Sequence, residues 1–225
     1  DEIGMPTSMV HNGSAWSIQR FISGFANNAF LITCATTNKS IIIDTPANPT
    51  DLIAAAKQTD VSAILITHGH QDHVEGFAEV NELFSVSTGI GIPDRASLPS
   101  TPSSSIDVTT GTLIEVGEIT LEARFTPGHT PGSTCYVLRS KSDDDKSFVF
   151  TGDTLFPGGP GRSSSNEALK HIVSSLKDQI YTLPGEHVIL PGHGEFTDIG
   201  SSRKEFEQFI STPWDASLAG DVTWI

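Results

Sequence analysis

Three histidines and one aspartate fall within six residues of this chain. They are His68, His70, Asp72 and His73, and they directly follow the apolar run 63–66. A short apolar run is typical of a buried strand, so we expect the cluster where a strand passes into a loop. Residues two apart leave a strand on the same side, so His68 and His70 can bind one metal ion. The tighter turn that follows lets Asp72 and His73 face a second position. Imidazole and carboxylate groups are ordinary zinc ligands, so the predicted chemistry is metal binding.

The alternative is a chance cluster of histidines on the surface. Histidine rarely fills a core, and an unpaired buried aspartate costs several kcal/mol. Four such side chains packed together without a metal ion would therefore be a poor structural choice.

Three more candidate ligands share one local setting. His129 and His193 each complete a Pro-Gly-His sequence, and Asp153 completes Thr-Gly-Asp. In each case a predicted strand ends, a glycine opens the backbone and a polar side chain follows, so we expect the strands to converge on one edge where loops build a site. The seven candidates exceed the three or four protein ligands of one tetrahedral zinc ion. Two ions that share a bridging carboxylate would use all seven, which predicts a dinuclear centre.

Side-chain periodicity predicts the elements that position these ligands. Residues 16–22 alternate apolar and polar side chains, as a half-buried strand does. Further strands are expected at 28–36, 40–43, 63–66, 84–88, 112–116, 120–125, 134–139, 147–150 and 186–190, helices at 50–58, 76–83, 166–182 and 202–210, and a loop at 98–105. Capping boxes of Ser164 with Glu167, and of Ser202 with Glu205, predict the starts of the last two helices. The order of elements predicts an α+β fold in which helices flank packed sheets.

Composition argues against several function classes. The net charge of −14 disfavours nucleic-acid binding, which needs a surface rich in Lys and Arg. No apolar stretch approaches the ~20 residues that cross a bilayer, so we expect no membrane partner. Residues 1–11 lack the pattern of a signal peptide, so we expect a cytoplasmic protein. The length predicts a single domain over 1–225, with irregular segments at 1–12 and 212–225.

Two cysteines, Cys34 and Cys135, lie in apolar strand-like segments. We expect free buried thiols, and a disulfide between them is left open because spacing does not determine pairing. The acidic run 143–145 is expected at a solvated hairpin tip.

The motif at 68–73, together with His129, Asp153 and His193, resembles that of the metallo-β-lactamase-fold hydrolase superfamily. The sequences 152–156 and the Gly-rich stretch ending in Arg162 resemble its glyoxalase II-like group. The resemblance covers nearly the whole chain and implies a four-layer αβ/βα sandwich with the metal site at the edge of two packed sheets. It also implies a first metal ion on His68, His70 and His129, a second on Asp72, His73 and His193, and Asp153 as the bridge.

This resemblance implies an activity. A hydroxide between two divalent ions, most simply Zn with Fe or Mn as alternatives, would attack a carbonyl, because two cations lower the pKa of bound water from ~15.7 towards ~7. Asp72 would be catalytic and orient the hydroxide. The family also carries an aspartate where this chain has Asp44, for which we weigh two roles equally: accepting a hydrogen bond from a ligand imidazole, or capping the turn near Pro46.

The resemblance implies an ester, thioester or lactone as the small-molecule substrate. The best-known zinc β-lactamases carry a cysteine where this chain has Asp153, which leaves at most a side activity on β-lactams. Acyl-homoserine lactonases carry a tyrosine shortly after the bridging aspartate, where this chain has 154–156 (Thr-Leu-Phe). Binding of glutathione thioesters is left open. We expect the substrate pocket near 21–28, 156–163 and the tail with Trp214 and Trp224, which could instead form a homodimer contact.

Two side chains of this expected pocket are candidates for substrate binding. Phe156 would form part of its wall, and Arg162 could hold a substrate carboxylate or be an ordinary surface residue. Two other function classes remain: a mononuclear iron persulfide dioxygenase of the same fold, and a non-catalytic module that kept its metal site.

Overall fold

Apolar side chains from two sheets face one another across the centre of the protein. The computed structural model describes residues 7–140 and 146–224. Phe30, Ile43 and Leu65 of the first sheet pack against Leu121 and Phe150 of the second in one continuous buried cluster. Burying two apolar sheet faces against each other is the dominant favourable term of such a fold.

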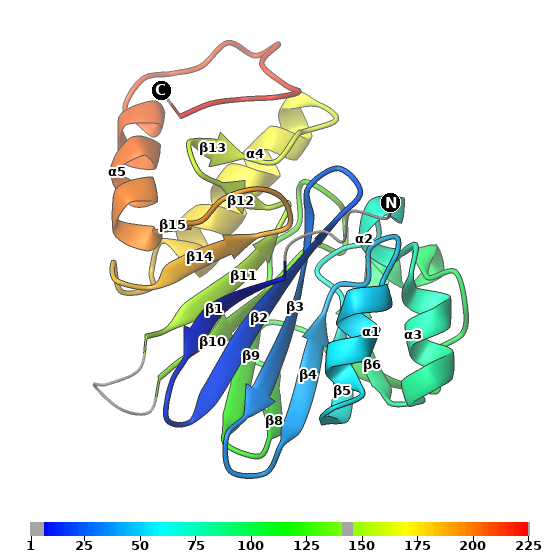
Figure 1. Ribbon diagram of the computed structural model, residues 1–225. Helices are drawn as coiled ribbons and strands as arrows, with labels where there is room; N and C mark the ends of the chain where they lie inside the picture. The colour runs from blue at the N-terminus through cyan, green and yellow to red at the C-terminus, as the bar shows by residue number, and fades with distance from the viewer. Residues whose placement is uncertain (1–6, 141–145, 225) are drawn as a thin grey trace, which may run out of the picture.

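The first sheet has seven strands whose spatial order follows the chain. They are β1 (Ser8–Asn12), β2 (Trp16–Ser23), β3 (Asn27–Cys34), β4 (Lys39–Ile43), β5 (Asp60–Leu65), β6 (Ser87–Gly91) and β7 (Ser104–Val108). The pairs from β1 to β4 are antiparallel and those from β4 to β7 are parallel. The parallel part is covered by α1 (Thr50–Ala56) and α3 (Phe77–Phe84), and the four-residue α2 (Gln71–Val74) follows β5 (Figure 1).

The second sheet has six strands in the order β15 (Thr197–Asp198), β14 (Val188–Pro191), β11 (Phe148–Gly152), β10 (Thr134–Leu138), β9 (Ile119–Phe125) and β8 (Leu113–Val116). Its outer face packs against α4 (Asn166–Ser175), the π-helical turn η2 (Leu176–Ile180) and α5 (Ile199–Ile210). A small pair, β12 (Leu155–Phe156) with β13 (Gly159–Pro160), and the 3₁₀ turn η1 (Ile92–Ser97) complete the described elements. The four layers of helices, sheet, sheet and helices confirm the predicted αβ/βα sandwich (Figure 1).

Several predicted boundaries are wrong for identifiable physical reasons. Residues 84–88 are not one strand, because Phe84 ends α3 and Ser85 takes a left-handed conformation with φ 50°. The predicted loop at 98–105 already contains the start of β7, whose side chains are mostly exposed and show no apolar alternation. The predicted irregular segment 1–12 contains β1, which adds to the sheet edge through the backbone.

Both predicted capping boxes are wrong. Ser165, rather than Ser164, caps α4 and accepts a hydrogen bond from the N–H of Ala168. Helix α5 begins at Ile199, before Ser202, because Asp198 accepts from the N–H of Ser201. The predicted helix 166–182 also changes to π-helical geometry at Leu176.

Both cysteines are buried and free, as predicted. The acidic run 143–145 lies outside the described residues. Within residues 7–140 and 146–224, no helix has the length and hydropathy that crossing a membrane requires.

Candidate metal centre

The seven predicted ligands meet at one end of the two sheets. His68 and His70 follow β5, Asp72 and His73 lie in α2, and His129 lies in the loop between β9 and β10. Asp153 follows β11, and His193 follows β14. Their donor atoms form three overlapping groups that could each hold a metal ion: His68, His70 and His129; His68, His73 and Asp153; and Asp72, His73 and His193.

Distances within these groups match the ligand spacing of a tetrahedral ion. Zinc–ligand bonds of about 2.0–2.1 Å place two ligands of one tetrahedral ion about 3.3 Å apart. Nδ1 of His70 lies 2.9 Å from Nε2 of His129. In the group of Asp72, His73 and His193, Nε2 of His193 lies 3.2 Å from Oδ2 of Asp72 and 3.1 Å from Nε2 of His73.

Asp153 lies between the group of His68, His70 and His129 and the group of Asp72, His73 and His193. We call these the two outer groups. Its Oδ2 is 3.6 Å from Nε2 of His129 and 3.4 Å from Nε2 of His193, and its Oδ1 is 3.3 Å from Nε2 of His73. This carboxylate therefore reaches ligands from both sides. A Cβ atom on Gly192 would lie 2.4 Å from Oδ1 of Asp153, so the chain after β14 needs glycine to pass this close.

Two buried atoms of the cluster have no hydrogen-bond partner. These are Nε2 of His68 and Oδ1 of Asp153, whose contact with His73 lacks hydrogen-bond geometry. Nδ1 of His68 lies 3.1 Å from the Thr67 hydroxyl, which itself donates to Asp44, so Nδ1 carries the proton and Nε2 offers a lone pair. Unpaired buried acceptors are rare in folded proteins, and metal ions are the groups that such a donor set binds. The residues fit a metal centre.

The electrostatics of the cluster also favour cations. Burial holds the pKa of His68 well below its ordinary value, and the neighbouring His73 lowers it further. Burial also acts to lower the pKa of His73, but the nearby carboxylate of Asp153 and the hydrogen bond to Asp44 outweigh it and raise that pKa to about 10. Burial opposes ionisation of Asp153, yet His193 and His73 hold its pKa well below the ordinary range. The site thus offers a neutral His68 imidazole and an ionised Asp153 carboxylate to a cation, and His73 would release its proton when an ion binds.

Hydrogen bonds to the outer ring nitrogens orient the other histidines. Nδ1 of His73 donates to Oδ2 of Asp44 (3.1 Å), and the same carboxylate accepts from the N–H (2.7 Å) and hydroxyl (2.8 Å) of Thr67. This geometry matches the first of the two roles that we weighed for Asp44. Nδ1 of His129 donates to the carbonyl of Arg162 (2.9 Å), and Nδ1 of His193 donates to the carbonyl of Phe25 (3.0 Å). Each bond leaves Nε2 facing the cluster.

Two buried side chains that position the candidate ligands were not predicted from the sequence. Asp94 is buried and accepts from the N–H of Gly69 (2.8 Å), the hydroxyl of Thr130 (2.6 Å) and the N–H of Gly132 (2.8 Å), so it joins two ligand-bearing loops. Asn27 donates to Asp72 from the tip of the β2–β3 hairpin. Asp94 lies in a Pro-Asp segment without periodicity, so no sequence pattern identifies it. Asn27 falls inside the predicted pocket wall 21–28, which names no single residue.

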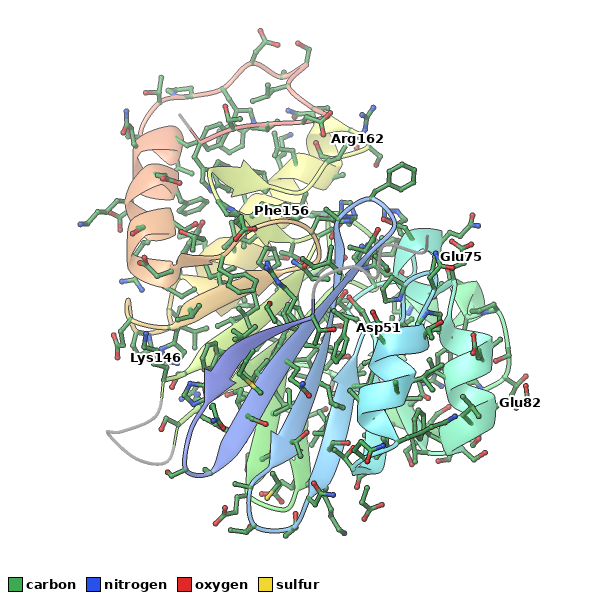
Figure 2. All side chains as sticks on the ribbon, in the orientation of Figure 1. Asp51, Glu75, Glu82, Lys146, Phe156 and Arg162 are labelled. Carbon is green, nitrogen blue, oxygen red and sulfur yellow. The ribbon has the colours of Figure 1, made fainter. Side chains whose placement is uncertain are left out.

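The tentative substrate residues differ in position. The Phe156 ring is half-buried, and its centroid lies 6.2 Å from that of His193. The Arg162 side chain is 72% exposed and pairs with Asp221 at 3.2 Å, beside the C-terminal segment (Figure 2). The part of Arg162 that contacts a candidate metal ligand is its backbone carbonyl, which accepts from His129. The predicted tail tryptophans pack on α5, where Trp224 contacts Phe206 and Trp214 stacks on Phe209.

A groove of about 640 Å³ opens beside His129. Apolar side chains and hydroxyls make up most of its wall, which is lined by Phe125, Pro127, Pro131, Ser164, Ser165, Ala168, His171 and Ser174, among others. No Lys or Arg lines it. It is large enough for part of a small substrate.

Comparisons with known proteins agree with this geometry. The model of the metallo-beta-lactamase superfamily matches residues 22–207. The probable hydroxyacylglutathione hydrolase glo2 of Schizosaccharomyces pombe is 36% identical over 197 residues, which cover 84% of this chain and 72% of that protein.

Two solved structures are similar at 25% identity. A metallo-beta-lactamase from Staphylococcus aureus has a TM-score of 0.75 over 86% of this chain, which spans 62% of that protein's length. TTHA1623, crystallised in a di-iron-bound form, has a TM-score of 0.64, and the match covers 81% of this chain and 95% of that chain. The resemblance inferred from the motif is confirmed, and the chain belongs to the metallo-β-lactamase superfamily as a metallo-hydrolase of the glyoxalase II-like group.

Proposed function

We propose that this protein hydrolyses a thioester, ester or lactone at a centre of two divalent metal ions. The observation that carries the proposal is the convergence of seven ligands, with Asp153 within reach of both outer groups and two buried acceptors left unpaired. A thioester is the first substrate class to test, because the S. pombe relative is named a hydroxyacylglutathione hydrolase.

Each outer group would hold one ion. His68, His70 and His129 would bind the first, Asp72, His73 and His193 the second, and Asp153 would bridge. Bound divalent cations would supply a nucleophilic hydroxide at neutral pH and polarise the substrate carbonyl. The known metal preferences of imidazole and carboxylate include Zn, Fe and Mn, and we propose Zn first.

The protein side chains contribute orientation. The Asp72 side chain is 38% exposed, with Oδ2 in the cluster, so this carboxylate could accept a hydrogen bond from the nucleophile and orient it towards the substrate carbonyl. The Phe156 ring beside His193 limits water on one side of the centre. The groove beside His129 would take the apolar part of the substrate.

The negative charge of the chain affects how an anionic substrate could bind. The chain carries −14 and no Lys or Arg is among the described residues that line the groove, so we propose Arg162, which pairs with Asp221, as the candidate partner of a substrate carboxylate. We therefore expect Arg162→Ala to raise KM for a glutathione thioester and to leave KM for a neutral thioester unchanged.

Metal content and turnover test the proposal together. We expect about two zinc ions per chain and hydrolysis of at least one member of a thioester, ester, lactone and β-lactam panel. Asp72→Asn should lose turnover, because it removes the ionised carboxylate. Glu75→Gln removes an exposed carboxylate from the same segment and should be active (Figure 2).

Other outcomes would contradict the proposal. One iron per chain, oxygen consumption and no hydrolysis would indicate the persulfide dioxygenase. Two bound ions without turnover on any substrate would favour the non-catalytic module. A homodimer and a cytoplasmic location stay predictions, and light scattering on the purified chain tests the first.

A further inference from the structure

The tip of the β2–β3 hairpin rests on the second ligand group. Asn28 N–H donates to the carbonyl of Gly192 (2.7 Å), and Gly194 N–H donates to that of Ala26 (3.2 Å). The Asn28 amide donates to the carbonyls of Pro191 (3.0 Å) and Gly194 (2.9 Å). The hairpin is thus paired to the loop that carries His193, more than 160 residues away in sequence.

Asn27 occupies the centre of this contact and is 1% exposed. Its Oδ1 accepts from the N–H of Phe25 (3.1 Å), which determines how the amide is turned. Its Nδ2 then faces Asp72 and donates to the backbone carbonyl (3.1 Å) and to Oδ2 (3.0 Å). Nδ2 also lies 3.4 Å from Nε2 of His193.

A turn alone does not explain this arrangement. An asparagine that only stabilised the hairpin would use Oδ1 and leave its amino group to solvent. Here the amino group is buried and has two acceptors in one residue, Asp72. Asp72 sits in a single four-residue helical turn, and its carboxylate accepts a hydrogen bond from Asn27 of the hairpin. Oδ2 is the oxygen that lies 3.2 Å from His193.

We propose that Asn27 is a positioning residue for the second metal ion, an inference that rests on the proposed dinuclear function. Its amide holds the Asp72 carboxylate towards His73 and His193 before an ion binds. Without it, Asp72 would have to lose rotamer freedom on binding, which weakens the second ion while leaving the first group intact. Loss of such outer contacts typically lowers metal affinity about 10- to 100-fold.

Zinc titration of the metal-free full chain against a chelator tests this inference without reference to activity. Asn27→Ser keeps a short acceptor for the Phe25 N–H but cannot reach Asp72, so it separates the turn from the contact. We expect the affinity for the second ion to fall about 10- to 100-fold and that for the first to stay unchanged. At low zinc, kcat should fall with KM unchanged, and added zinc should restore it.

Phe25→Ala is the matched control. This side chain is 88% exposed at the same tip, and its backbone groups that contact Asn27 and His193 are retained, so both affinities should equal those of the wild type. Thermal unfolding of the metal-free variants verifies folding, and Asn27→Ala provides a second substitution.

Two results would overturn the inference. Either Asn27→Ser binds both ions as the wild type does, or it weakens both equally, which indicates general loosening. A wild-type chain that binds fewer than two ions would instead refute the dinuclear function.

Discussion

Three candidate ligand histidines, His73, His129 and His193, donate Nδ1 to oxygens from distant segments of this chain. Asp44 serves His73, and the carbonyls of Phe25 and Arg162 serve His193 and His129. Such bonds fix ring orientation and raise the basicity of the ligand atom. We therefore expect metal affinity at this centre to depend on residues that never contact an ion.

Asp44→Asn should lower zinc affinity about 10- to 100-fold. The amide can still accept from the Thr67 N–H, but an amino group opposite Nδ1 of His73 faces a donor. Asparagine also tolerates the positive φ of 60° at this position, so backbone strain does not confuse the result. Chelator competition measures the affinity, with Asp51→Asn, an exposed acid of α1, as the control (Figure 2). Equal affinities in the two variants would contradict the role of Asp44.

Asp94→Ala should destabilise the metal-free protein by more than about 3 kcal/mol. The substitution leaves the N–H groups of Gly69 and Gly132 and the Thr130 hydroxyl without their buried acceptor. Urea denaturation measures the free energy of unfolding. Asp107→Ala removes an exposed acid that pairs with Arg95 and should cost less than about 1 kcal/mol. A small loss for Asp94→Ala would mean that water replaces the carboxylate.

At the scale of elements, strands deliver the ligands and helices close the outer faces. Strands β5, β11 and β14 each end in the cluster, so their register in the sheets sets the relative heights of His68, Asp153 and His193. The parallel pairing of β11 with β14 matches Gly152 with Pro191, which brings Asp153 and His193 to one edge. The cap of α5 then holds the chain that returns after β14.

Asp198→Ala should cost about 1 kcal/mol of unfolding free energy at pH 7. The N–H of Ser201, then its hydroxyl, hold the pKa of Asp198 below its ordinary value of 3.8. Because the folded-state pKa is depressed, this stabilisation is present above pH 3.8 and is lost as pH falls through the folded-state pKa. The difference in urea midpoint between variant and wild type should therefore be constant above pH 3.8 and begin to shrink as the pH falls below it. Glu207→Ala, an exposed position within α5, should show no such change.

At the scale of the whole molecule, the metal centre joins the two sheets. Its ligands come from both, so ions bound there stabilise the folded chain as a unit by mass action. The centre gathers the carboxylates of Asp72 and Asp153 in a chain that already carries −14, and bound cations would balance these charges once His73 has lost its proton.

Removal of the metal should lower the Tm. A free ion concentration of 100 Kd stabilises by about 2.7 kcal/mol, which for a chain of this size corresponds to a shift on the order of 5–10 °C. Calorimetry with and without chelator measures the shift, which zinc should restore. The shift should be smaller in Asp72→Asn, because one ion is lost. An unchanged Tm would contradict metal binding at this centre.

The sequence by itself determined the layer order and singled out the seven candidate ligands that the fold brings together. A strand, a glycine and a polar side chain form a local pattern, and strand and helix periods are local too, so both can be read from neighbouring residues. The cap of α4 was misplaced by one residue and the start of α5 by three, because Ser165 and Asp198 compete with nearby serines as caps. The strands β1 and β7 were missed because their exposed side chains lack apolar alternation.

Only the tertiary structure decided which groups hold the ligands in place. Asn27 and Asp72 are 45 residues apart, and Phe25 and His193 are 168 apart. Their contacts depend on how two sheets and a hairpin pack, and no local period encodes that. The same holds for Asp94 and for the Arg162 carbonyl, since every residue type has a backbone carbonyl and the sequence gives no sign of which one is used. A metal ligand is specified by its side-chain chemistry, whereas its support is specified by the position of whatever oxygen or nitrogen the fold brings near.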